Sequence, residues 1–116
     1  MSSIQRYHVG PRLCETVVHN NTVYLAGQIA ETLSKDALGQ TEEVLACIDR
    51  LLAEVGSDKS KILQVTIFLS DMNDYDAMNR AWSEWVPQGH TPARATVQAK
   101  LADPNYLVEM TVIAAL

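Results

Sequence analysis

The sequence predicts a protein of the α+β class, in which two helices pack on one face of a mixed, mostly antiparallel sheet. Short runs of β-prone residues lie near both ends of the chain. Between them, two segments carry apolar residues at steps of three and four, which is the spacing of an amphipathic helix. The order of elements is β-β-α-β-α-β-β, and we expect it to form one domain over residues 1–116.

The first predicted element is a β-hairpin. Its strands are the β-prone runs at residues 16–19 and 22–26. Asn20 and Asn21 separate them, and asparagine tolerates the left-handed backbone of a tight turn.

A helix is predicted over residues 36–55, where the period changes from two to about three and a half. Ser34 or Asp36 could cap its start, and Gly56 stands where a left-handed C-terminal cap is favoured. The apolar stripe that we expect to face the core consists of Leu38, Thr41, Val44, Leu45, Ile48, Leu51, Leu52 and Val55.

Residues 63–69 alternate as a strand with one covered face. A second helix is predicted from Tyr75, since acidic residues precede a periodic apolar run, and Pro87 ends it. Within this helix we interpret Trp82 and Trp85 as core or interface aromatics.

Two strands close the chain, at residues 94–101 and 107–115, with a turn at 103–105 between them. We expect the more uniformly apolar side of each strand to face the helices. Arg94 and Glu109 would then share the sheet face that the helices leave uncovered, and a symmetric oligomer could cover that face. The alternative is an ion pair between adjacent strands that provides no ligand site.

Composition excludes several classes of function. The net charge is −5, with 14 acidic and 9 basic residues and no basic stripe, which argues against nucleic acid as a partner. No apolar run has the length of a membrane span or of a signal peptide, so we expect no membrane association and a cytoplasmic protein. Cys14 and Cys47 are too few for a disulfide framework, and the three histidines lack metal-ligand spacing; we therefore expect free thiols and no metal site.

Several segments form a recognisable pattern when they are taken together, in order, through nearly the whole chain. They are Leu25-Ala26-Gly27-Gln28-Ile29, Asp74-Tyr75-Asp76-Ala77-Met78-Asn79, Thr91-Pro92-Ala93-Arg94-Ala95-Thr96-Val97, Leu107-Val108-Glu109-Met110 and Val112-Ile113-Ala114-Ala115. With this pattern the chain resembles the RidA/YjgF family, small cytosolic deaminases of reactive enamines and imines.

The resemblance implies a chorismate-mutase-like fold, assembled as a homotrimer with equivalent ligand clefts between subunits. It also implies hydrolysis of 2-iminopropanoate-like 2-imino acids to 2-oxo acids and ammonia, without a cofactor or metal. By similarity, Arg94 would bind the substrate carboxylate and Glu109 would position the attacking water. Gly27 would let the backbone approach the ligand, and the Thr96 main chain would add a donor. Asn79 matches a position near the cleft, although its spacing also suits a helix-surface amide or a local bond to the sheet.

The chain departs from the family pattern at two places. The stretch at residues 11–15 lacks the family's tyrosine, and Ala26 replaces the family's serine. These differences indicate a divergent subfamily. Cys14 is a candidate ligand contact or nucleophile, but a packed thiol without a catalytic role is the better interpretation.

Three functions therefore compete. The leading hypothesis is an imine deaminase, and the alternative is a non-enzymatic binder or sensor of 2-oxo acids or related metabolites. A ribonuclease, a label that some members of the family carry, is disfavoured by the acidic charge and by the absence of a basic patch.

Overall fold

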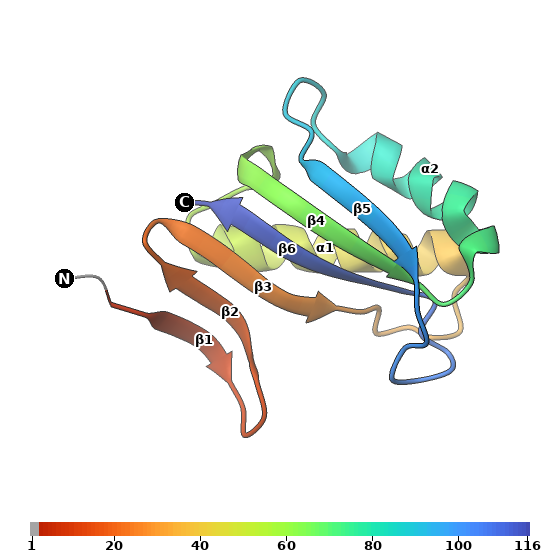
Figure 1. The fold of residues 1–116 in the computed structure, drawn as a ribbon, viewed down its shortest axis with the longest axis horizontal. Helices are drawn as coiled ribbons and strands as arrows, with labels where there is room; N and C mark the ends of the chain where they lie inside the picture. Colours follow the sequence, from red (N-terminus) through yellow and green to blue (C-terminus); the bar gives the residue numbers. More distant parts are fainter. Residues whose placement is uncertain (1–2) are drawn as a thin grey trace.

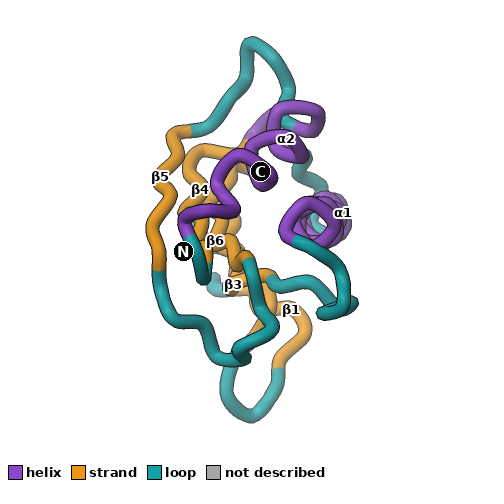
Figure 2. The backbone as a smooth tube through the Cα atoms, turned by 90° about the vertical axis from the view of Figure 1, so that its right-hand side faces the viewer, coloured by secondary structure: helices purple, strands orange, loops and turns teal. Residues whose placement is uncertain are grey.

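The computed structural model describes residues 3–116 as one six-stranded sheet with two helices on one of its faces (Figures 1 and 2). The strand order is β1-β2-β3-β6-β4-β5; every pair is antiparallel except β4 with β5. The elements are β1 (Gln5–Val9), β2 (Cys14–His19), β3 (Thr22–Gln28), α1 (Ala37–Glu54), β4 (Ile62–Leu69), α2 (Tyr75–Trp85), β5 (Ala93–Gln98) and β6 (Val108–Ala115), with 3₁₀ turns at Lys59–Lys61 and Met72–Asp74.

The predicted fold class is confirmed, but one strand was missed. β1 pairs with β2 at the edge of the sheet, and its residues are mostly exposed. An edge strand without a buried face carries no apolar alternation, so its sequence gives no periodic signal. His8 also interrupts the pairing, since it adopts a φ of 56° and is skipped in the register between Tyr7 and Val9.

The turns and caps follow the sequence closely. Asn20 and Asn21 take φ values of 51° and 59°, as the hairpin prediction requires. Of the two candidate caps, Asp36 is the one that is used: it caps α1 by accepting a hydrogen bond from the Gly39 amide at 2.9 Å. Gly56 has a φ of 82° after the helix, a backbone conformation that favours glycine.

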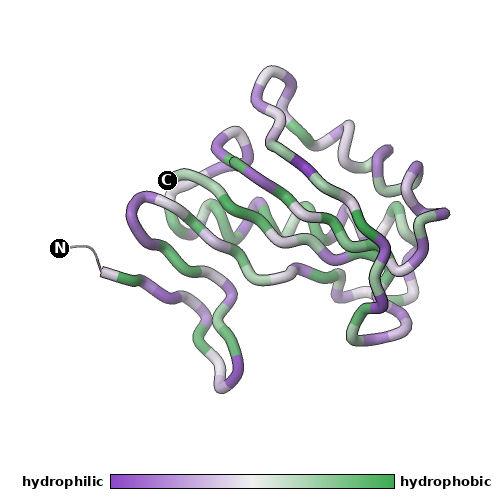
Figure 3. The backbone as a smooth tube through the Cα atoms, in the orientation of Figure 1, coloured by the Kyte–Doolittle hydropathy of each residue, from purple (hydrophilic) through white to green (hydrophobic). Residues whose placement is uncertain are grey.

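The core lies between the helices and the helix-facing sides of β3, β4 and β6. Figure 3 shows that β6, in the middle of the sheet, is mostly hydrophobic along its length. Residues on β4 and β6 alternate between this core and the opposite face, so Val65 and Met110 are fully buried. The two helices are linked at their surface, where the Trp85 indole donates a hydrogen bond to Asp49 at 2.9 Å. Among the described residues, neither helix has the length and hydrophobicity needed to cross a membrane.

The prediction that Arg94 and Glu109 share one sheet face was wrong. β5 runs parallel to β4, and Arg94 is in register with Val65, which points to the helices. Glu109 pairs with Phe68, and both point to the uncovered face. The apolar side of β5 is the exposed one, with Val97 41% exposed, because this edge strand lies beside α2 and not over the core centre.

Gln40 anchors the loops that lead into the site. It lies on α1 and is fully buried. Its amide nitrogen donates to the Asn105 carbonyl at 3.0 Å and to the Lys35 carbonyl at 3.2 Å, while its oxygen accepts from the Leu107 amide at 3.0 Å. The start of β6 is therefore tied to α1 two residues before Glu109.

A second anchor holds the loop after β3. The Glu43 carboxylate accepts hydrogen bonds from the backbone amides of Glu31 and Thr32 at 3.1 and 3.0 Å. It also forms an ion pair with Lys35 at 2.7 Å. Chiefly because of the hydrogen bond from Lys35, the pKa of Glu43 is lowered to about 2.

Candidate functional site

Arg94 lies in a cage of side chains from α2. Its Nη1 donates to the Asn79 side-chain oxygen at 2.7 Å, and its Nη2 donates to the Tyr75 hydroxyl at 3.2 Å. The guanidinium carbon is 5.2 Å from the centroid of the Trp82 ring and 5.9 Å from that of Tyr75. The guanidinium is therefore held in place by its position over the two aromatic rings and by two hydrogen bonds.

Sequence reasoning missed two members of this cage. Asn79 was named, and it bonds Arg94 rather than lying as a free surface amide. Tyr75 was placed at the start of the second helix and within the family pattern, without a role in the site, and Trp82 was assigned to the core or an interface. Trp82 is indeed buried, at 7% exposure, but its ring also faces Arg94. The spacing of Tyr75, Asn79 and Trp82 at i, i+4 and i+7 places them on one side of a helix and could have revealed the group.

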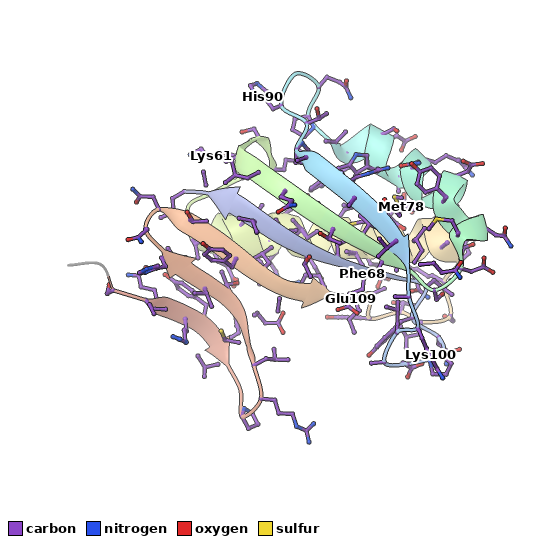
Figure 4. The ribbon with its side chains drawn as sticks, in the orientation of Figure 1. Lys61, Phe68, Met78, His90, Lys100 and Glu109 are labelled. Carbon is purple, nitrogen blue, oxygen red and sulfur yellow. The ribbon has the colours of Figure 1, made fainter. Side chains whose placement is uncertain are left out.

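Glu109 forms a second cluster with Gly27, on the other side of the sheet from Arg94. Figure 4 labels Glu109 together with its cross-strand partner Phe68. A Cβ atom at Gly27 would overlap the Glu109 carboxylate, with its Cδ only 2.9 Å away. A β-bulge shifts the register of β3 against β6 at this point. Only glycine leaves room for the carboxylate in its present position, which is a stronger reason for Gly27 than backbone freedom.

Glu109 lines a groove of about 680 Å³ at the end of β3. Leu13, Glu15, Ala26 and Tyr106 are among its lining residues. Gln28 donates from its amide nitrogen to Glu15 at 2.8 Å and so fixes a second carboxylate in the groove wall. The groove combines apolar surface with three glutamates, Glu15, Glu31 and Glu109, and one arginine, Arg50. Because the acidic residues outnumber the basic one, it can accept a small organic cation better than a free anion.

Arg94 and Glu109 cannot meet within one chain. They lie on strands separated by β4, on opposite faces, and three residues apart in register. Strand spacings of about 4.8 Å and a rise of about 3.3 Å per residue put their Cα atoms about 10 Å apart across the sheet and about 10 Å along it. The sheet itself stands between the two side chains.

The remaining candidates lie near one or the other cluster. Thr96 points to the same face as Arg94, in register with Ile67, and its hydroxyl has no hydrogen-bond partner within residues 3–116. Cys14 and Cys47 are half-buried and form no disulfide within residues 3–116; their reduced state stays a prediction. Cys47 lies near Arg50, at 3.8 Å from its guanidinium, on the helix side of the groove.

The sequence and the fold can be compared with those of known proteins. The model of the family described as Endoribonuclease L-PSP matches residues 5–116. A RutC family protein of Haemophilus influenzae is 53% identical over 113 residues, which are 97% of each chain. The RutC family protein YoaB of Escherichia coli is 50% identical over 97% of this chain and 98% of its own. The crystal structure of NMB1025 of Neisseria meningitidis, a member of the YjgF protein family, has a TM-score of 0.95 at 45% identity, covering 97% of this chain and 94% of that one.

The chain thus belongs to the Endoribonuclease L-PSP family. This is the RidA/YjgF family predicted from the sequence, a family that includes imine deaminases, and both the family and the chorismate-mutase-like fold are confirmed. The assignment to a divergent subfamily stays a prediction.

Proposed function

We propose that this protein is a deaminase of small 2-imino acids whose site forms between two copies of the chain. The observation that carries the proposal is that the chain contains two separate prepared groups. One is Arg94, held by Asn79 and Tyr75, and the other is the Glu109 carboxylate, for which the missing Cβ of Gly27 leaves room. Each half alone can hold one part of the substrate. A face-to-edge contact between copies, as in a cyclic trimer, would bring the two halves together.

The substrate chemistry fits these groups. A protonated 2-imino acid carries a carboxylate at one end and an electrophilic iminium carbon at the other. The Arg94 fork would bind the carboxylate through charge-assisted hydrogen bonds. Glu109 would hold a water against the iminium carbon and accept its proton during attack. Glu109 would then return this proton to the amine nitrogen of the resulting amino alcohol. Loss of the hydroxyl proton and cleavage of the C–N bond release ammonia and leave the 2-oxo acid.

The uncovered sheet face supports an interface between copies. On its central strands it exposes Tyr24, Thr66, Phe68, Thr111 and Ile113, with Glu109 as the only charged group on β6. A mixed surface of this kind is apolar enough to be buried and carries few charges that burial would leave unpaired. Covering it would place the Glu109 cluster at the boundary between copies.

The test is a coupled assay in which a serine or threonine dehydratase supplies the imine. We expect the purified protein to accelerate 2-oxo acid formation above the solvent rate. Arg94→Ala should abolish this effect while the protein remains folded, and Glu109→Gln should reduce turnover more than it weakens 2-oxobutyrate binding. Arg80→Ala and Glu84→Gln, at exposed positions on α2, are the matched controls. Full activity in both site variants would refute the mechanism.

A second candidate is a binder or sensor of 2-oxo acids that lacks turnover. It is favoured by Leu13 and Ala26 in the Glu109 groove, two apolar side chains that cannot hydrogen-bond a water. Saturable binding of 2-oxobutyrate without any acceleration of imine loss would select this candidate over the deaminase. Ala26→Ser would then test whether one added hydroxyl introduces turnover.

A further inference from the structure

We propose that Tyr75 is part of the carboxylate-binding end of the site, where its hydroxyl orients Arg94 and donates its own proton to the bound carboxylate. The inference rests on the proposed function and adds a residue to it. No motif in the sequence pointed to this role, which follows from the position of the phenol beside the guanidinium.

The geometry gives the hydroxyl two tasks. The Tyr75 oxygen accepts a hydrogen bond from Nη2 of Arg94 at 3.2 Å. Arginine has no acceptor, so the phenolic proton must be donated elsewhere. Within residues 3–116, the hydroxyl has no other hydrogen-bond partner. Its donor is therefore available to a ligand that binds the same guanidinium.

Exposure separates Tyr75 from its neighbour in the cage. Trp82 is 7% exposed and can only support the guanidinium from the core side. Tyr75 is 38% exposed, at the first turn of α2, so its hydroxyl can be reached from outside the chain. The buried Trp82 ring contacts the guanidinium from the core side, and the exposed Tyr75 ring is the one that a ligand can contact.

Asn79 and Tyr75 together decide which part of the arginine fork is free. One N–H of Nη1 is directed to Asn79, and one of Nη2 is directed to Tyr75. A guanidinium has five N–H groups, so three of those of Arg94, together with the phenolic O–H of Tyr75, have no hydrogen-bond partner within residues 3–116. A carboxylate can accept several such bonds at once, whereas a neutral amide in its place cannot accept them all.

The Tyr75→Phe variant removes the hydroxyl and retains the ring that stacks near Arg94. We expect its affinity for 2-oxobutyrate, measured by calorimetry, to fall about tenfold, the usual effect of losing one hydrogen bond to a charged group. The affinity for the neutral 2-oxobutyramide should change little. In the coupled assay, KM should rise and kcat should be nearly unchanged.

The control is Tyr7→Phe, which removes a hydroxyl on β1, remote from Arg94 in the strand order; it should bind 2-oxobutyrate as the wild type does. Arg94→Ala tests the proposed function separately. Loss of binding in Arg94→Ala with unchanged binding in Tyr75→Phe would overturn the role of Tyr75 and leave the proposed function standing. An equal loss for the carboxylate and the amide would also overturn it, because it would indicate a structural defect. Absence of both binding and turnover in the wild type would refute the proposed function, and this inference with it.

Discussion

Mixing the Arg94→Ala and Glu109→Gln variants should restore activity lost in both if each site takes Arg94 from one copy and Glu109 from another. Arg94→Ala retains an intact Glu109 cluster, and Glu109→Gln retains an intact Arg94 cage. Because the sheet separates the two side chains within a chain, a working site in a mixed oligomer needs one copy of each kind.

The expected recovery can be calculated from random assembly. At equal concentrations, the copy that supplies Glu109 is the Arg94→Ala variant with a probability of about one half. The neighbour that supplies Arg94 is the Glu109→Gln variant with the same probability. The mixture should therefore recover about one quarter of the wild-type activity per site, whatever the size of the closed ring.

The assay uses the two variants refolded together from denaturant, so that subunits exchange fully, and then compared with each variant refolded alone. Imine hydrolysis is measured in the dehydratase-coupled assay for all three samples and for refolded wild type. Two controls are needed: refolded wild type must regain its activity, and mass spectrometry must verify that mixed oligomers have formed. If the mixture is then no more active than its components, sites do not combine residues from two copies.

Three further changes test the supports of the site. Gly27→Ala should displace the Glu109 carboxylate and lower kcat/KM about 100-fold. The free energy of unfolding should change by less than about 1 kcal/mol, because the flexible Glu109 side chain can move away. A loss of stability with unchanged kcat/KM would contradict this prediction. Gln40→Ala should lower the free energy of unfolding in urea by about 3 kcal/mol, since buried backbone groups lose their partners, whereas Gln88→Ala in an exposed loop should have little effect. Glu43→Gln should destabilise the protein at pH 7 and much less near pH 2: the pKa of Glu43 is lowered to about 2, so its contribution is full above its ordinary value of 4.5 and is lost as the pH falls towards 2. A destabilisation equal at both pH values would refute that linkage.

The sequence predicted the central elements well, because their alternation follows burial. Val108, Met110, Val112 and Ala114 of β6 all face the core, as their phase indicated. β5 violates the same rule. It is an edge strand beside α2, so its polar side meets the cage around Arg94 while its small apolar residues stay exposed. Alternation reports only that a strand has two different sides, and the topology decides which side faces the helices.

The site was predictable as a set of residues and not as a geometry. Arg94, Asn79, Gly27 and Glu109 were recognised through the family pattern, and two close pairs among them are seen in the structure. Their division between opposite faces depends on the parallel pairing of β5 with β4, a contact between strands that are not consecutive in the chain. Such pairing leaves no local mark on either strand.

Gln40 recognises its loop through main-chain groups alone. Its partners are the carbonyls of Lys35 and Asn105 and the amide of Leu107, none of which depends on the side chain at that position. Substitutions in the segment before β6 can therefore alter the rim of the site without releasing the strand that carries Glu109. Because Gln40 holds the main chain and not the side chains of this segment, ligand preference can change over evolution while the Glu109 carboxylate keeps its position.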